Sequence, residues 1–133
     1  MARPRLPFPT PGEFEILRLV WEHGELTVRD VHQLLLPHKP RAYTSIMTIL
    51  KVMTDKGLLA RRTRGRAFVY AAGVEERKTL HGMLHDMLTR VYRGSLVSLF
   101  GDLIDCAAPS ECELGHLVQT LQRKISARES AAV

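Results

Sequence analysis

The sequence predicts a mainly α protein in which three short helices are followed by one β-hairpin and then by further helices. Apolar residues recur at three- and four-residue spacing before residue 57 and again after residue 73, which is the period of amphipathic helices. Between them, residues 58–71 form two short runs of strand-forming residues around a glycine-containing turn. With 133 residues, the chain has room for one compact domain and an appendage.

The first helix is predicted from about Pro11 to His23. Thr10 and Glu13 have the spacing of a capping box, with proline at the first helical position, and Gly24 closes the segment. Its apolar face consists of Phe14, Leu17, Val20 and Trp21.

Two shorter helices follow. Thr27 can cap a second helix that Pro37 stops, with Val28, Val31, Leu34 and Leu35 on one face. A third helix begins near Tyr43 and ends at Lys56-Gly57, because glycine readily adopts the left-handed conformation of a helix C-terminus. We expect it to bury Ile46, Ile49, Leu50 and Met53.

Residues 58–63 and 67–71 then read as two strands joined through Arg64-Gly65-Arg66. Three helices followed by a hairpin is the order of a winged helix-turn-helix, in which the hairpin is the wing. We therefore predict a winged-helix DNA-binding domain over residues 1–73.

Beyond Gly73 the pattern is helical, with a break at Gly94-Ser95 and a last helix opened by a capping box at Ser110 and Glu113. Helices this short cannot bury their apolar stripes alone, so residues 74–133 are predicted to form a helical dimerisation domain. The residues expected at that interface are Leu80, Leu84, Met87, Leu88, Val91, Leu96, Phe100, Leu103, Leu117 and Leu121.

The positive charge lies entirely in the first half of the chain. The net charge is +5, yet residues 1–72 hold 12 Lys and Arg against 6 Asp and Glu, and residues 73–133 hold 7 against 8. A basic half joined to a neutral half is typical of a polyanion-binding module attached to a partner-binding module.

The third helix carries the candidate contacts to DNA bases. Opposite its apolar face lie short hydroxyl side chains that permit close approach, a methionine suited to a thymine methyl group, and a lysine for a phosphate. These residues are Tyr43, Thr44, Ser45, Met47, Thr48 and Lys51. The alternative is a merely solvated polar face, but the face has no acidic residue before Asp55.

The wing carries the candidate phosphate contacts. Arg62, Arg64 and Arg66 alternate along the hairpin, so they can line one edge toward a phosphate backbone or minor groove. Arg41, before the third helix, is a further candidate. The alternative is a charged edge strand that discourages aggregation.

Other kinds of site find little support. His81 and His85 are four apart on a helix, but only Asp86 lies nearby as a further metal ligand, and Cys106 and Cys112 lack the spacing of a zinc site. We therefore expect no metal and no cofactor. No nucleotide-binding or nucleophile motif is present, so we expect no enzyme.

The start of the chain does not resemble a targeting segment. Residues 1–9 carry Arg3 and Arg5 without an apolar stretch after them, which disfavours a secretory signal. No apolar run reaches membrane-spanning length either. We expect a cytoplasmic protein that does not insert into the membrane.

Five blocks of sequence resemble the BlaI/MecI/CopY family of bacterial repressors, in family order and spacing. They are PGEFEIL at 11–17 with Val20-Trp21, LTVRDV at 26–31, YTSIMTIL at 43–50, DKGLL at 55–59 and GRAFVY at 65–70. The resemblance covers residues 11 to about 105, and the last helix in pattern only. It implies a homodimeric winged helix that binds double-stranded DNA at palindromic operators built from TACA and TGTA elements. By position, the family motif matches Tyr43, Thr44, Ser45, Thr48, Lys51 and Gly65-Arg66.

The resemblance also implies an inducing signal. In the β-lactam branch a membrane sensor protease system leads to cleavage at an Asn–Phe bond, and the corresponding pair here is Leu99-Phe100. The copper branch carries paired CxC motifs that Cys106 and Cys112 do not supply. A metal- or ligand-responsive regulator and a winged-helix protein-interaction module remain the alternatives to a repressor released by proteolysis.

Overall fold

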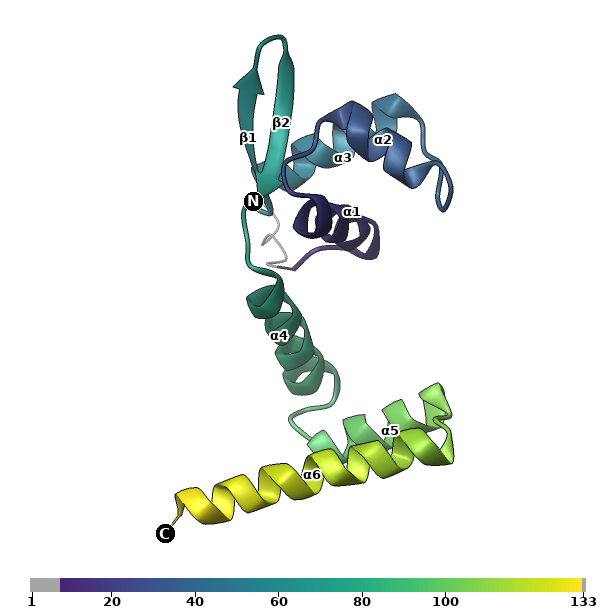
Figure 1. Ribbon diagram of the computed structural model, residues 1–133, viewed down its shortest axis with the longest axis vertical. Helices are drawn as coiled ribbons and strands as arrows, with labels where there is room; N and C mark the ends of the chain where they lie inside the picture. Colours follow the sequence, from purple (N-terminus) through teal and green to yellow (C-terminus); the bar gives the residue numbers. More distant parts are fainter. Residues whose placement is uncertain (1–7, 133) are drawn as a thin grey trace. The chain divides into compact units, whose positions relative to one another are not determined.

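The computed structural model describes residues 8–132, so the predicted features of residues 1–7, with Arg3 and Arg5, lie outside the described part. Its elements are α1 (Pro11–His23), α2 (Val28–Leu35), α3 (Tyr43–Asp55), β1 (Leu59–Arg64), β2 (Ala67–Ala72), α4 (Glu76–Asp86), the π-helical turn η1 (Met87–Val91), α5 (Leu96–Ala107) and α6 (Glu111–Ala131) (Figure 1). Three helices followed by an antiparallel hairpin confirm the winged helix-turn-helix.

The chain divides after His85 into two compact units. This division follows from contacts within one chain, so the functional boundary expected near residue 73 stays a prediction. None of the helices that the structure describes has both the length and the apolar character needed to cross a bilayer.

The first two helices begin where local capping chemistry predicts. Thr10 Oγ1 accepts a hydrogen bond from the Glu13 N–H at 3.2 Å, and Glu13 Oε1 accepts one from the Thr10 N–H at 2.9 Å. Thr27 and Asp30 form a second box of the same kind, at 3.1 and 3.0 Å. Each box satisfies two backbone donors that the first turn of a helix would otherwise leave unpaired.

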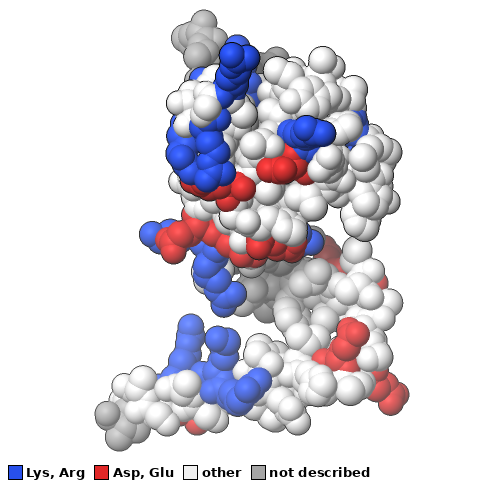
Figure 2. Space-filling view, turned by 45° about the horizontal axis from the view of Figure 1, so that its top comes forward, with Lys and Arg blue, Asp and Glu red and all other residues white. Residues whose placement is uncertain are grey.

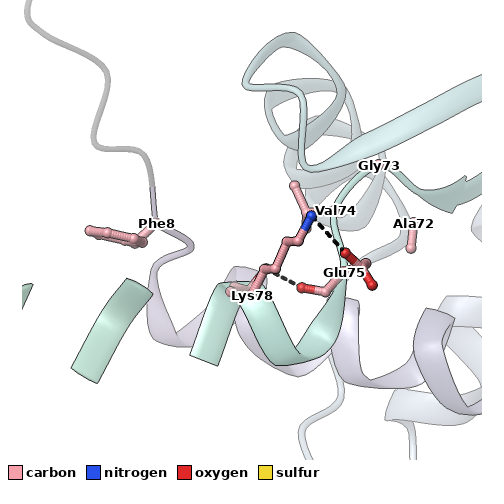
Figure 3. Close-up of a pocket in the computed structure, with 7 residues that line it drawn as sticks. Phe8, Ala72, Gly73, Val74, Glu75 and Lys78 are labelled. Carbon is pink, nitrogen blue, oxygen red and sulfur yellow. Dashed lines mark hydrogen bonds and ion pairs between the residues drawn. The ribbon is translucent and has the colours of Figure 1, made fainter. Parts of the chain in front are cut away.

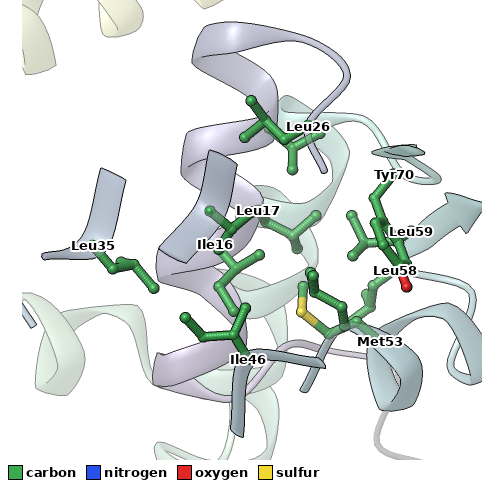
Figure 4. Close-up of a cluster of buried hydrophobic side chains, with 12 residues drawn as sticks. Ile16, Leu17, Leu26, Leu35, Ile46, Met53, Leu58, Leu59 and Tyr70 are labelled. Carbon is green, nitrogen blue, oxygen red and sulfur yellow. The ribbon is translucent and has the colours of Figure 1, made fainter. Parts of the chain in front are cut away.

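Every buried apolar residue that the structure describes belongs to the first unit (Figure 4). The apolar stripes of α1, α2 and α3 meet there and are closed by side chains from the strands. The core consists of Ile16, Leu17, Val20, Leu26, Val31, Leu35, Ile46, Leu50, Met53, Leu58, Leu59 and Tyr70. Ile49, expected in this core, is only partly buried.

Backbone and side-chain hydrogen bonds attach the wing to the helices. Leu26 pairs with Tyr70 of β2 through two backbone hydrogen bonds of 3.0 and 2.8 Å, so the link between α1 and α2 covers one edge of the hairpin. Trp21 Nε1 of α1 donates to the Val74 carbonyl at 3.1 Å, just beyond β2. The base of the wing is therefore held both by α1 and by the link that follows it.

The second unit has no core of its own. No residue of α5 or α6, all of which the structure describes, is buried. The helical stretch expected between Gly73 and Gly94 is also interrupted, because α4 ends at Asp86 and a π turn follows. The chain reverses at Arg93 and Gly94, both at positive φ, and the Gly94 N–H bonds to the Leu88 carbonyl at 2.8 Å. That bond closes the helix end and fixes the break that the Gly-Ser pair predicts.

Candidate nucleic-acid interface

One face of α3 is buried and the other is exposed. Ile46, Leu50 and Met53 are completely buried, which fixes the rotation of the helix on the core. The opposite side, called here the recognition face, carries the predicted base contacts, and all of them are exposed. The recognition face consists of Tyr43, Thr44, Ser45, Met47, Thr48 and Lys51.

Two contacts restrain the recognition face. Thr48 Oγ1 donates to the Thr44 carbonyl at 3.0 Å, so its proton points back into the helix and its lone pairs are directed outward as acceptors. The Tyr43 ring meets His32 of α2 edge-to-face, with ring centres 5.8 Å apart. These side chains therefore have defined positions before any ligand arrives.

The N-terminus of α3 has a property that the sequence analysis did not single out. Ala42 precedes the helix, and among the described residues no side chain caps it, whereas α1, α2, α5 and α6 each begin at a capping Thr or Ser. Unpaired N–H groups at a helix start suit a phosphate. The uncapped start of α3 could have been recognised in the sequence, because Pro40-Arg41-Ala42 lacks a capping residue.

The loop before α3 folds back on α1. Lys39 Nζ donates to Glu15 Oε1 at 2.8 Å, and the Arg41 guanidinium lies beside Gly12, with Nη2 3.2 Å from where a Cβ would stand. The hydrogen bond from Lys39 lowers the pKa of the Glu15 carboxyl and outweighs the opposing effect of burial, and the charges of Lys39 and Arg41 lower it further. Arg41 therefore lies close to both the start of α3 and an acidic group.

Lys and Arg side chains gather over the hairpin (Figure 2). The two strands are joined by a tight turn at Gly65, whose φ of 62° favours glycine. Arg64 and Arg66 flank this turn and are exposed. Arg61 stacks over the Phe68 ring on the neighbouring strand, with Cζ 4.2 Å from the ring centre. The tip of the wing thus presents cations outward from a stiffened strand pair.

Arg62 differs from the other wing arginines because a carboxylate already holds it. Its Nε donates to Glu25 Oε1 at 2.9 Å, and Nη2 donates to Oε2. The hydrogen bond from Arg62 lowers the pKa of Glu25 and outweighs the opposing effect of burial, and the charges of Arg62 and Arg64 add to the lowering. Sequence reasoning missed Glu25, because its partner lies 37 residues away and no local pattern marks the pair.

Known proteins of similar sequence cover most of this chain. The family model described as the penicillinase repressor matches residues 9–123. The penicillinase repressor of Bacillus licheniformis is 26% identical over 118 residues, which cover 89% of this chain and 92% of that protein. The methicillin resistance regulatory protein MecI of Staphylococcus aureus (strain N315) is 21% identical, covering 85% and 92%.

The chain belongs to the penicillinase repressor family. It is a DNA-binding transcriptional repressor and not an enzyme. Among solved structures, a mutant MarR from E. coli superposes with a TM-score of 0.51 at 13% identity, covering 88% of this repressor and 78% of that chain. That likeness concerns the fold alone.

The other candidates of the sequence analysis do not assemble into a site in the repressor. Among the described residues, no group of three His, Cys, Asp or Glu side chains is placed to hold a metal ion. Cys106 and Cys112 are exposed free thiols.

A hollow of about 570 Å³ in the repressor lies away from the recognition face. It is lined by Phe8, the end of β2 and the start of α4 (Figure 3). Lys78 pairs with Glu75 in it at 3.1 Å, and the Thr79 hydroxyl donates to the Glu75 carbonyl at 2.7 Å. These polar groups are thus paired with one another rather than directed at a ligand.

The ten predicted dimerisation residues are all exposed or half-buried in the single chain. Leu84, Met87, Val91, Leu96, Leu103 and Leu121 are exposed. The Leu99-Phe100 bond lies inside α5.

Proposed function

We propose that the protein is a homodimeric, sequence-specific repressor in which α3 reads bases in the major groove and the wing contacts the phosphate backbone. The observation that carries this proposal is the recognition face, which is exposed, rich in hydroxyl groups and free of acidic side chains, beside a hairpin whose turn is flanked by arginines. Hydroxyl and methyl groups on a rigid helix suit base edges, and flexible cations suit phosphates.

The second unit supports the homodimer. Val97 is 85% exposed and Leu96 is 62% exposed, although both lie on a strongly apolar helix. With Phe100 and Gly101 of α5 and Leu121 of α6, they line a recess that is almost wholly apolar. Exposed apolar surface of this extent marks an interaction site, and a second copy offers the complementary surface under two-fold symmetry.

A two-fold dimer predicts the form of the operator. Two recognition helices related by symmetry read a palindrome whose half-sites lie about one helical turn apart. We expect the TACA and TGTA elements that the family resemblance implies, and a cytoplasmic location because the operator lies on the bacterial chromosome or a plasmid.

Release from DNA is proposed to follow an inducing signal such as proteolysis at Leu99-Phe100 by a membrane sensor protease system. This bond lies within α5, so the helix must open locally before a protease can bind the backbone. Cleavage there would separate α6 and part of α5 from the rest of the chain, and with them four of the ten residues proposed at the dimer interface, Phe100, Leu103, Leu117 and Leu121. Mass spectrometry of the repressor from induced cells tests this step through fragments that end at Leu99.

Fluorescence anisotropy with a duplex containing a TACA/TGTA palindrome and a scrambled duplex, at several salt concentrations, tests the main proposal. We expect two chains per duplex, a steep salt dependence and a preference of at least ~10³ for the palindrome. Equal affinity for both duplexes would contradict the predicted operator. Failure to bind either duplex would contradict DNA binding and favour a protein-interaction module.

A further inference from the structure

We propose that Glu25 is a positioning residue for the wing: its ion pair with Arg62 fixes the angle of the hairpin against the helices, and Arg62 does not contact DNA. The inference rests on the proposed DNA-binding function and assigns one wing arginine a different role from that of Arg64 and Arg66. It depends on where the backbone places the pair, on the geometry of the pair and on its charge.

The backbone places Glu25 at the base of the wing. Gly24 ends α1 at a φ of 82° and turns the chain toward the hairpin. The next residue after Glu25, Leu26, is paired with Tyr70 by two backbone hydrogen bonds. Residue 25 is therefore fixed to the edge of β2 by its immediate neighbour.

The strand register then brings Glu25 and Arg62 to the same face. Side chains alternate along a strand, and directly opposed residues share a face. Arg62 of β1 is opposite Val69 of β2, and the bridge at Leu26 sets Glu25 beside Ala71, two residues further along β2. The carboxylate thus reaches across β2 to the far strand of the wing, and one interaction joins all three segments.

The pair orients the hairpin and adds little to the stability of the fold. Its side chains are 54% and 40% exposed, and pairs this exposed add little to the free energy of folding. Two parallel hydrogen bonds between a guanidinium and a carboxylate, however, define a direction as well as a distance. A phosphate would have to displace Glu25 or approach beside its negative charge, so Arg62 is poorly placed as a phosphate ligand.

A small change in the wing's angle would have a large effect at its tip. The turn lies three residues beyond Arg62, or roughly 10 Å at about 3.3 Å per residue. A tilt of about 10° at Arg62 therefore moves Arg64 and Arg66 by up to roughly 2 Å, which misaligns hydrogen bonds that tolerate only a few tenths of an ångström. Both cations stay beside the backbone, so they neutralise the same phosphates with weaker contacts.

The test compares full-length variants on the palindromic and scrambled duplexes at several salt concentrations. We expect Glu25→Gln, Arg62→Gln and Arg62→Lys each to weaken binding roughly tenfold, with the salt slope unchanged. The double variant Glu25→Gln/Arg62→Gln should bind no more weakly than either single variant. The charge-swapped variant Glu25→Arg/Arg62→Glu should regain most of the affinity, because it restores the pair. Arg64→Gln is the matched control, and we expect it to lower the salt slope by about one for each phosphate that the variant no longer neutralises.

Two results would overturn the inference. Tighter binding by Glu25→Gln, with a salt slope steeper by about two because the dimer carries two copies of Arg62, would make Arg62 a phosphate ligand that Glu25 masks. A charge-swapped variant with the parent's melting temperature that does not regain affinity would show that the pair itself is not what matters. In either case the parent protein still binds DNA, whereas a parent that binds neither duplex contradicts the proposed function itself.

Discussion

The buried ion pair between Glu13 and Lys56 offers a sharp test of how the DNA-binding unit is held together. Glu13 is 5% exposed and accepts hydrogen bonds from the Thr10 N–H at 2.9 Å and from Lys56 Nζ at 2.9 and 3.0 Å. Since Lys56 is the C-cap of α3, the pair joins the start of α1 to the end of the recognition helix. Burial raises the pKa of Glu13, but the hydrogen bonds from Thr10 and Lys56 and the charge of Lys56 outweigh it, so the pKa lies below its ordinary value.

We expect Glu13→Gln to lower the free energy of unfolding by about 2 kcal/mol at neutral pH. The amide keeps an acceptor for the Thr10 N–H but gives up a charged hydrogen bond, and such bonds contribute about 1.5–3 kcal/mol. Because the Lys56 side chain is 24% exposed, it regains some hydration in the variant. The loss is therefore smaller than the roughly 3–5 kcal/mol that follows when one partner of a fully buried pair is removed. For a unit of this size the melting temperature should fall by roughly 10 °C.

The loss of stability in Glu13→Gln should depend on pH. A carboxyl whose pKa is lower in the folded state contributes its full stability above the unfolded value, about 4.3, and loses it as the pH falls through the folded value. Thermal denaturation followed by circular dichroism between pH 7 and pH 3 should therefore show the gap between parent and Glu13→Gln closing below about pH 4.3. Glu15→Gln, which loses only an exposed pair with Lys39, should melt close to the parent. If the melting temperatures of the parent and Glu13→Gln differed equally at both ends of this pH range, this account of the pair would be refuted.

Three further predictions concern DNA binding and assembly. Thr48→Ala should reduce the preference for the palindrome over the scrambled duplex while leaving the salt slope unchanged, because it removes an acceptor from the recognition face but no charge; an unaltered specificity ratio would exclude Thr48 from base contact. Arg64→Gln/Arg66→Gln should weaken binding to both duplexes equally and lower the salt slope, as anisotropy at several salt concentrations would reveal. Leu121→Glu should yield a folded monomer in sedimentation velocity, since it buries a charge in the proposed dimer interface, whereas Gln122→Glu, with the same added charge on the neighbouring residue, should remain dimeric.

Local signals made much of the fold predictable. Thr10 with Glu13 marks the start of α1, and the observed helix has the predicted bounds because both halves of that capping box form. Gly57 and Gly65 stand at positive φ, as a helix end and a tight hairpin turn require. These features depend on residues a few positions apart, which is the range over which sequence patterns carry structural information.

Long-range pairs were not predictable from the same patterns. Glu13 meets Lys56 across 43 residues, and Trp21 reaches the Val74 carbonyl across 53. The spacing of these residues predicts a helix cap at Glu13 and a place on an apolar face for Trp21, but it does not identify the distant partner of either. The candidate interface shares this limit, because sequence reasoning could place Arg62 on the wing but could not find the carboxylate that holds it.

These pairs also determine how much of the positive charge is available to DNA. Residues 1–72 contain 12 Lys and Arg, but Lys39, Lys56 and Arg62 each face a carboxylate. The proposed interface retains Lys51, Arg64 and Arg66, with Arg41 as a fourth if it turns from α1 to a phosphate. A dimer then makes about six to eight phosphate contacts, which corresponds to a slope of about −5 to −7 for log K against log salt. A slope of about −11 would correspond to about six neutralised phosphates per chain, and it would contradict an interface of three or four cations.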